Sequence, residues 1–431
     1  MAAWGARRSG VDDVVTRLRK RKGDIGAPTT ICLLSNRKVG PSEAVKIAEA
    51  LEDNDTLTEL LCSGHAIGAE GSRAIGKALA KNSTLERLCV GDVELGNESA
   101  ASILEGLVQC GARSKLKEID LELKGIDGAG AALLGPLISK CVNLKILKVG
   151  RNNLGKDGAE RLLDGLSAGS EAECGVRHLD LTACGVNSVP KSFASFPLTE
   201  LILDGNAPFT SLSAVPMATL THLSIKECGL TAESVLELLR ITNGMPLRLQ
   251  TLKISGNKIG DDGAVHVAEF LKLSKEAKVV ELASCGIGES GGIALSKAVS
   301  DTLNHLDLCS NKVGAESIAH MCAVGISSIR AMDNDLKDEG VTHIAQKVEH
   351  FSPSLQMLDL CGNKICAPGC TVLCEALLAH SRAEKLTIAL GANAIEAEGE
   401  IAILGVLEQK AGVIEILRDE KWKNTQETND E

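Results

Sequence analysis

Aromatic side chains are almost absent from this chain, which contains 5 Phe, 2 Trp and 0 Tyr in 431 residues. Both tryptophans, Trp4 and Trp422, lie outside the repeated region described below. Aromatic residues usually anchor the energetic centres of protein interfaces. A binding surface on this chain is therefore predicted to act through charge rather than through an aromatic pocket.

An excess of basic residues and long apolar runs are also missing. Asp and Glu number 57 against 46 Lys and Arg, a net charge of −11, which argues against nucleic acid or an anionic membrane as the main partner. No apolar run reaches the ~20 residues of a membrane span, and the N-terminus lacks the apolar core of a secretory signal. The 15 cysteines follow no disulfide spacing framework, so free thiols in the cytoplasm or nucleus are predicted.

What the chain does contain is a repeated segment, seen most clearly in residues 249–271. There Leu252 and Ile254 alternate with polar residues, the period-two pattern of a strand with one buried face. From Gly263 to Leu271 the apolar residues recur at helical spacing. One strand and one helix in about 28 residues cannot bury these faces alone, so neighbouring units must stack.

The same frame recurs along almost the whole chain. Fourteen units cover residues 24–417 at spacings of 22 to 32 residues, and each has one reference position equivalent to Asn257. The other reference positions are Arg37, His65, Val93, Lys124, Asn152, Cys184, Asn206, Cys228, Cys285, Asn311, Asn334, Asn363 and Asn393.

The repeated pattern L-x-x-L-x-L-x-x-N/C-x-L resembles the leucine-rich repeat signature. Clear copies are residues 144–155, 303–314 and 355–366. With its full helix and long period, the repeat resembles the ribonuclease-inhibitor-like subclass, which includes the Ran GTPase-activating proteins and the repeat domains of NOD-like receptors. This resemblance implies an α/β fold: a right-handed leucine-rich repeat solenoid (horseshoe) with a parallel β-sheet on the concave face and helices on the convex face.

The ends of the chain are predicted to lie outside the repeats. Residues 1–23 are predicted to be an N-terminal tail followed by a basic cap helix over residues 9–22, and residues 418–431 a polar C-terminal tail. The cap helix is the favoured interpretation of the first segment. Its basic run, from Arg17 to Lys22, leaves open a nuclear-import signal or a docking patch.

Two units near residues 180–220 differ from the rest. Each is 22 residues long, and four prolines, Pro190, Pro197, Pro208 and Pro216, fall where a helix would run. A proline inside a helix costs ~3 kcal/mol. We therefore expect extended or short 3₁₀ segments there, and a change of curvature at these helix-poor units.

Motifs that could carry chemistry are better explained by the repeat. Residues 150–157 come within one residue of a phosphate-binding loop, but Asp157 stands where Ser or Thr is needed. Cys366, Cys370 and Cys374 resemble a metal cluster, yet the last two fall on small inward helix positions, where cysteine acts as a compact hydrophobe. No histidine has an acid–base partner at a useful spacing. We predict no enzyme activity, no cofactor and no metal.

Charged residues beside the buried strand positions make the concave sheet the predicted binding surface. Asp120, Asp180, Asp307 and Asp359 share one column between the two buried residues of their strands. The simpler alternative is that a solvated strand face needs polar residues. If the column is functional, it forms an acidic track, broken by lysines, for a protein partner with a basic face. The predicted contact residues are Asp180, Lys253, Glu281, Asp307, Arg330 and Asp359.

The predicted function is that of a non-catalytic scaffold that recognises other proteins through its concave surface. Two alternatives stay open. The resemblance implies a GTPase-activating regulator like the Ran activators, although the chain ends in a short segment of mixed charge rather than the long acidic segment typical of those proteins. A structural subunit of a cytoskeletal or flagellar assembly is the third interpretation. The sequence predicts no oligomeric state.

Overall fold

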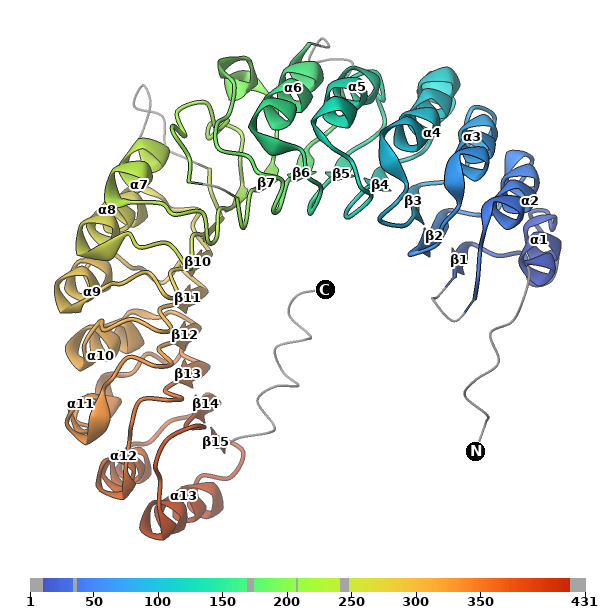
Figure 1. Cartoon of the computed structure of the whole chain (residues 1–431). Coiled ribbons are helices and arrows are strands. Elements are labelled where there is room, and N and C mark those ends of the chain that lie inside the picture. The colour runs from blue at the N-terminus through green and yellow to red at the C-terminus, as the bar shows by residue number, and fades with distance from the viewer. Residues whose placement is uncertain (1–10, 34–36, 169–173, 207, 241–247, 419–431) are drawn as a thin grey trace. The chain divides into compact units, whose positions relative to one another are not determined.

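The computed structural model describes residues 11–33, 37–168, 174–206, 208–240 and 248–418. The chain divides into two compact units, Met1–Leu220 and Thr221–Glu431. Both units repeat one motif, a short strand followed by a turn and a helical segment (Figure 1).

In the first unit, seven parallel strands pair in chain order, and every neighbouring pair is in register. The strands are β1 (Thr30–Cys32), β2 (Glu59–Ser63), β3 (Arg87–Gly91), β4 (Glu118–Asp120), β5 (Ile146–Lys148), β6 (His178–Asp180) and β7 (Glu200–Ile202). The helical segments are α1 (Asp12–Leu18), α2 (Pro41–Glu52), α3 (Gly68–Leu79), α4 (Gly96–Cys110), η1 (Gly111–Arg113), α5 (Gly128–Ile138), α6 (Gly155–Ser167) and η2 (Lys191–Ser195).

The second unit repeats this arrangement with strands β8 to β15. They are β8 (His222–Ser224), β9 (Thr251–Lys253), β10 (Val279–Glu281), β11 (His305–Asp307), β12 (Ser328–Arg330), β13 (Met357–Asp359), β14 (Leu386–Ala389) and β15 (Ile414–Leu417). The helical segments are α7 (Ala232–Leu239), α8 (Gly260–Leu273), α9 (Glu289–Ser296), α10 (Ala315–Val324), α11 (Lys337–Ala345), η3 (Val348–His350), α12 (Ala367–Ala379) and α13 (Ala397–Gln409).

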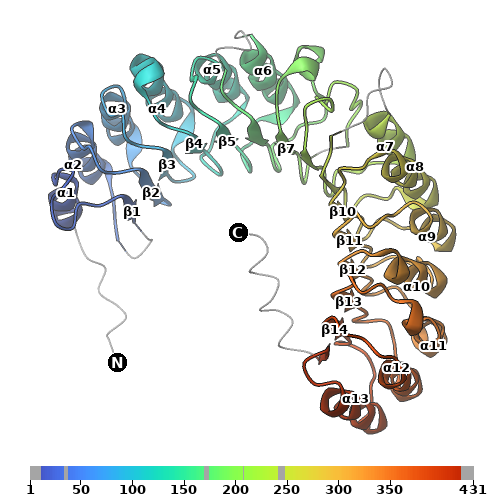
Figure 2. The same ribbon diagram turned by 180° about the vertical axis from the view of Figure 1, so that it is seen from behind.

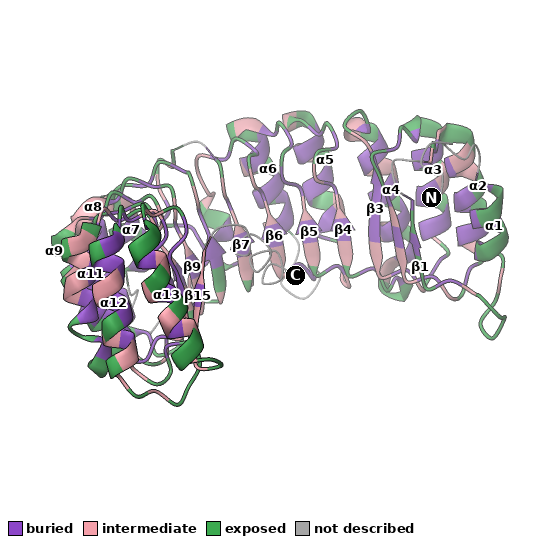
Figure 3. Ribbon diagram, turned by 90° about the horizontal axis from the view of Figure 1, so that it is seen from below, coloured by how far each residue is buried: buried purple, intermediate pink, exposed green. Residues whose placement is uncertain are grey.

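Within each unit the helices cover one face of the sheet and leave the opposite strand face open (Figures 1 and 2). Buried residues follow the strands and the inner sides of the helices, and exposed residues lie on the outer sides and in loops (Figure 3). The predicted α/β repeat solenoid is confirmed. The last strand of the second unit, β15, pairs with β14.

The reference position of each repeat joins neighbouring units. The buried Asn257 side chain donates from Nδ2 to the carbonyls of Ile225 and Ile254, both at 2.7 Å, and accepts at Oδ1 from the amides of Cys228 and Leu230. These four bonds satisfy turn backbone that would otherwise be buried without partners. Where cysteine replaces asparagine, the thiol takes over part of this role: in the first unit the Cys184 Sγ donates to the Val149 carbonyl at 3.2 Å.

Two helices approach each other closely through glycine. A Cβ on Gly106 of α4 would lie 1.9 Å from the Gly76 carbonyl oxygen of α3, closer than any side chain permits. Glycine at this position therefore sets the spacing between the two helices.

The helix-poor character of residues 180–220 is confirmed. The helix expected at this place in other units is replaced by the 3₁₀ segment η2. Phe193 and Phe196 stack with ring centroids 4.8 Å apart and fill the space beneath it. The change of curvature expected here stays a prediction.

The N-terminal helix is shorter than predicted. It runs from Asp12 to Leu18 rather than over residues 9–22, and it packs its Val14, Val15 and Leu18 inward as a cap would. The prediction failed because the Arg21 amide bonds to Asp24 at 2.8 Å, which favours a turn over another helical turn. Residues 1–8 and the tail beyond Arg418 lie outside the described residues. In the described part of the chain, no helix combines the length and apolarity needed to cross a bilayer.

Candidate functional site

The open face of the second unit's sheet carries five charged residues side by side. Strands β9 to β13 pair in register, so Lys253, Glu281, Asp307, Arg330 and Asp359 are lateral neighbours on successive strands. We call these five residues the charged row. Adjacent strands lie ~4.8 Å apart, so each charge is within reach of the next.

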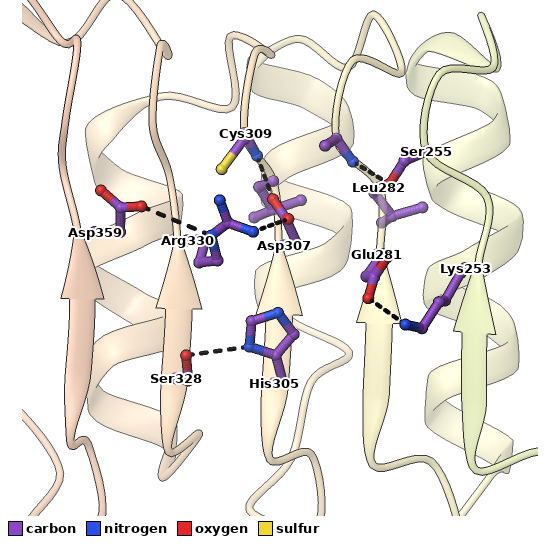
Figure 4. A network of polar contacts seen from close by, with 12 residues as sticks. Lys253, Ser255, Glu281, Leu282, His305, Asp307, Cys309, Ser328, Arg330 and Asp359 are labelled. Carbon is purple, nitrogen blue, oxygen red and sulfur yellow. Dashed lines mark hydrogen bonds and ion pairs between the residues drawn. The ribbon is translucent and has the colours of Figure 1, made fainter. Parts of the chain in front are cut away.

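Ion pairs link the members of the charged row (Figure 4). Lys253 Nζ lies 3.0 Å from Glu281 Oε1, and Arg330 lies between two carboxylates, 2.9 Å from Asp307 Oδ2 and 3.7 Å from Asp359 Oδ2. Cations and anions thus neutralise one another along the row. Like charges at strand spacing repel. Glu281 and Asp307 are direct neighbours, and each of them has a cation on its other side, Lys253 and Arg330 respectively.

The two aspartates of the charged row are buried. The Asp307 side chain is 8% exposed and that of Asp359 is 0% exposed, whereas Lys253, Glu281 and Arg330 expose 30%, 20% and 23%. A partner on this face would therefore meet the lysine, glutamate and arginine first.

The aspartates have a second bond that explains their burial. Asp307 Oδ1 accepts the Cys309 amide at 2.9 Å, and Asp359 Oδ1 accepts the Cys361 amide at 3.0 Å. The same bond recurs in the first unit, where Asp180 Oδ1 accepts the Thr182 amide at 2.8 Å. The aspartate column is thus an Asx-turn position that fixes the chain as it leaves each strand. This role was not predicted from the sequence, although an aspartate recurring at the last strand residue is its signal.

The surroundings of the charged row shift the pKa values of its neighbours. Burial lowers the pKa of His305, against the opposing effect of Asp307 and Glu281, and its Nδ1 lies 3.1 Å from the Ser328 hydroxyl. Burial also raises the pKa of the Cys309 thiol, and Asp307 raises it further. For Arg330, burial acts to lower the pKa, but Asp307 and its other anionic neighbours outweigh it, so the pKa is raised.

Asp180, the sixth predicted contact residue, belongs to the first unit. Its row there runs through Asp120, Lys148 and Asp180 on β4, β5 and β6. Lys148 pairs with Glu118 at 3.0 Å, and His178 Nδ1 lies 2.7 Å from Glu200 Oε2. The structure thus brings five of the six predicted residues into one row and places Asp180 in a separate unit.

The cysteines that resemble a metal cluster behave as predicted for core residues. Cys370 and Cys374 on α12 are buried at 0% and 1% exposure, Cys366 is exposed at the start of that helix, and Cys361 follows β13. A hydrogen bond from Cys374 lowers the pKa of the Cys370 thiol. No group of three metal-ligating side chains occurs among the described residues.

The near-match to a phosphate-binding loop also has a structural explanation. Asn152, at its centre, is buried and donates to the carbonyls of Leu121 and Val149 at 2.7 Å. Its Oδ1 accepts the amides of Lys124 and Ile126. Residues 150–157 are therefore one turn of the repeat, with the same bonds as the turn at Asn257.

Comparisons with known proteins agree with this architecture. The family model described as "Leucine Rich repeat" matches residues 140–163 and 249–268. The ribonuclease inhibitor of Sus scrofa is 28% identical over 333 residues, with coverage of 73% of this chain and 66% of the inhibitor. The NACHT, LRR and PYD domains-containing protein 5 of Bos taurus is 25% identical over 283 residues, with coverage of 56% of this chain and 25% of that protein.

Among solved structures, "Crystal structure of Rad7 and Elc1 complex in yeast" aligns with 88% of this chain and 84% of its own, at 14% identity and a TM-score of 0.48. The chain spans about two thirds of the inhibitor's length and a quarter of the NACHT protein's. The chain thus has the leucine-rich repeat fold, and in its repeat frame, its in-register parallel strands and these two relatives it resembles the ribonuclease-inhibitor-like subclass.

Proposed function

We propose that this protein is a non-catalytic protein-recognition solenoid whose charged row binds a partner protein. The observation that carries the proposal is the row itself: five charged residues in register on one open strand face, held by ion pairs. The ribonuclease inhibitor of Sus scrofa is, by its name, an inhibitor. An inhibitor acts by binding another protein, and this relative therefore supports a role in binding.

Three residues of the charged row would make the contacts. Lys253, Glu281 and Arg330 keep part of their side chains in water. Asp307 and Asp359 would act as positioning residues, because they hold the Arg330 guanidinium in place from below. Side chains fixed before binding lose little conformational entropy on association.

The charge pattern supports a partner of mixed surface charge at the contact. The charged row contains both signs of charge, so Glu281 offers a carboxylate to a partner's lysines, and Lys253 and Arg330 offer cations to its carboxylates. The net charge of −11 attracts a partner with a basic face before the two surfaces touch, and this attraction raises the rate of association.

The chemistry beside the row supports binding rather than catalysis. Cys309 is buried next to Asp307, and both burial and the carboxylate raise the pKa of its thiol. A thiol acts as a nucleophile only when it is deprotonated. This thiol is therefore a poor nucleophile at neutral pH.

A charge swap tests the proposal without removing an ion pair. The double variant Lys253→Glu with Glu281→Lys keeps an ion pair at these two positions but exchanges the places of its positive and negative charges. Affinity purification from the native cells, followed by quantitative mass spectrometry, should recover a stoichiometric partner with the wild-type protein and lose it with the double variant. Circular dichroism should be unchanged.

The matched control is the same swap elsewhere, Glu52→Lys with Lys81→Glu, at an ion pair between the ends of two helices. This control should retain the partner. Equal recovery with both double variants would exclude the charged row as the binding surface. A small GTPase as the partner would instead support the regulator alternative, and a cytoskeletal or flagellar protein the structural one.

A further inference from the structure

Helix α5 is the one described α-helix without a polar or charged side chain. Its eleven residues read GAGAALLGPLI, whereas every other described α-helix carries at least one charged residue. A helix that is apolar all round is normally buried on all sides. Helix α5 instead lies in the outer layer of the first unit, between α4 and α6, and one of its sides faces solvent (Figure 1).

The inner side of α5 is apolar because it is packed. Ala131, Leu134 and Ile138 are buried with 0% exposure, and glycine allows a close approach to α6. A Cβ on Gly135 would lie 2.9 Å from the Leu162 carbonyl oxygen, closer than real Cβ atoms come. Packing therefore explains the composition of the inner side, but it does not explain that of the outer side.

The outer side of α5 carries a second apolar stripe. Five apolar residues there are exposed or partly exposed: Ala129, Ala132, Leu133, Pro136 and Leu137. We call them the outer stripe. They recur at the three- and four-residue spacing that places side chains on one side of a helix. Leu133, at the centre, is 50% exposed.

The neighbouring helices are polar at the places equivalent to the outer stripe. Leu133 is nine residues after its reference position, and the same step gives Ser102 in α4 and Arg161 in α6. The places equivalent to Ala129 and Pro136 are acidic and exposed in both neighbours, and we call these four residues the acidic rim: Glu98, Glu105, Asp157 and Asp164. A contiguous apolar patch rimmed by polar residues marks an interaction site.

The charges beside the outer stripe decide which kind of partner fits. Helix α4 has no basic residue, and α6 has three acidic residues against two basic ones. A second copy of the chain on this face would bring one acidic rim against the other, and like charges oppose association. An anionic membrane surface would be repelled for the same reason. A helix whose apolar stripe is flanked by lysine or arginine has the complementary chemistry.

We propose that the outer stripe of α5 is a docking site for an amphipathic, basic helix of a partner protein. The partner helix lies along α5 and covers Leu133 with its apolar face, and its lysines or arginines pair with the acidic rim. This site belongs to the first unit and the charged row to the second. It is therefore a second interaction surface, and it does not depend on the function proposed for the charged row.

A synthetic peptide tests the docking site. The probe is a fluorescently labelled peptide of leucine and lysine, about five helical turns long, with all its leucines on one face of the helix. The control peptide has the same composition, in an order that spreads the leucines around the helix. Fluorescence anisotropy with the full chain should show tighter binding of the amphipathic peptide. Leu133→Gln should weaken this binding about tenfold, because it removes an apolar side chain that the peptide buries.

Two matched variants and a charge variant act as controls. Leu236→Gln makes the same change at an aliphatic residue of α7 that is 43% exposed, and it should bind the peptide like the wild-type protein. The swap Lys253→Glu with Glu281→Lys in the charged row should also leave the binding unchanged. The double variant Glu98→Gln with Glu105→Gln should weaken the binding and reduce its dependence on salt.

Three results would overturn the docking site. They are equal binding of the two peptides, equal binding of the amphipathic peptide by the wild-type protein and Leu133→Gln, and an equal loss in Leu236→Gln. Circular dichroism checks that each variant is folded. A wild-type dimer in analytical ultracentrifugation that becomes a monomer in Leu133→Gln would also overturn it, and would assign the outer stripe to a second copy of the chain.

Discussion

The guanidinium of Arg330 donates to the carboxylate of Asp307 on the neighbouring strand at 2.9 Å, although the Asp307 side chain is only 8% exposed. Asp359 approaches the same guanidinium from the other side. One cation therefore serves two buried carboxylates on two strands. This arrangement makes the centre of the charged row a structural element as well as a candidate contact.

Arg330→Ala is expected to destabilise the second unit more than other changes in the charged row. The variant leaves Asp307 and Asp359 buried without their shared cation, which costs about 2–4 kcal/mol. Urea unfolding measures the loss. Lys253→Ala is the comparison, because its more exposed ion pair with Glu281 should contribute less than about 1 kcal/mol. Equal losses in the two variants would contradict a special role for Arg330.

Asn257→Ala is expected to cost more than its size suggests. The side chain makes four hydrogen bonds to turn backbone in a place with 0% exposure, so its loss leaves buried donors and acceptors unpaired. We expect a loss of about 2–4 kcal/mol in the free energy of unfolding. Asn257→Cys should lose less, because cysteine occupies this position in three other repeats and Cys285 bonds the Ile254 carbonyl from it. A cysteine variant as unstable as the alanine variant would refute this reasoning.

The charged row shows how far sequence reasoning could go. Its members are 23 to 29 residues apart, and the repeat frame predicted one column for its two aspartates, Asp307 and Asp359. The in-register strands add Lys253, Glu281 and Arg330 to that column. The frame could not show that Asp307 and Asp359 turn inward, since that depends on hydrogen bonds to the backbone two residues later. The acidic track, broken by lysines, that was expected from the strand positions is in the second unit a row of charges that form ion pairs.

Lys124 shows a second limit. It occupies a reference position, where the repeat pattern has asparagine or cysteine, and is 2% exposed. Its Nζ donates to the Ser63 hydroxyl of β2, two repeats earlier, at 2.8 Å. Val93, at the reference position between them, is 55% exposed and so does not fill the interior. The Lys124 side chain can reach Ser63 because the residue between them, Val93, points outward. The pattern of a single repeat does not reveal this, since it depends on a residue of the neighbouring repeat.

Two of the 15 cysteines should react with a thiol reagent much faster than the other thirteen. Cys32 and Cys366 are exposed, and the remaining cysteines are buried. Burial raises the pKa of Cys62, Cys141 and Cys285 to about 12, and only the thiolate reacts quickly. Ellman's reagent at pH 8 should therefore titrate two thiols rapidly in the native protein and all 15 in denaturant.

The double variant Cys32→Ser with Cys366→Ser is the control and should abolish the rapid phase. A third fast thiol in the native protein would show that one of the buried sites opens on the timescale of labelling.

His305 is expected to make the stability of the second unit depend on pH. Burial lowers the pKa of the His305 imidazole in the folded protein below its ordinary value of 6.5. The charges of Arg330 and Lys253 lower this pKa further, whereas those of Asp307 and Glu281 raise it. As the pH falls below about 6.5, the unfolded chain gains a proton that the folded chain does not. The contribution of neutral His305 is thus present above about pH 6.5 and is lost as the pH falls towards the folded pKa. A tenfold difference in proton affinity between the folded and unfolded chain corresponds to ~1.4 kcal/mol.

His305→Gln retains a polar side chain near Ser328 but cannot titrate. The free energy of unfolding, measured in urea at pH 7.5 and pH 5.5, should therefore fall less in His305→Gln than in the wild-type protein. His320→Gln, at an exposed position of α10, is the control and should follow the wild-type pH dependence. The substitution removes one titratable group, the imidazole of His305. If His305→Gln loses as much stability as the wild-type protein on acidification, this imidazole is not the group responsible for the pH dependence.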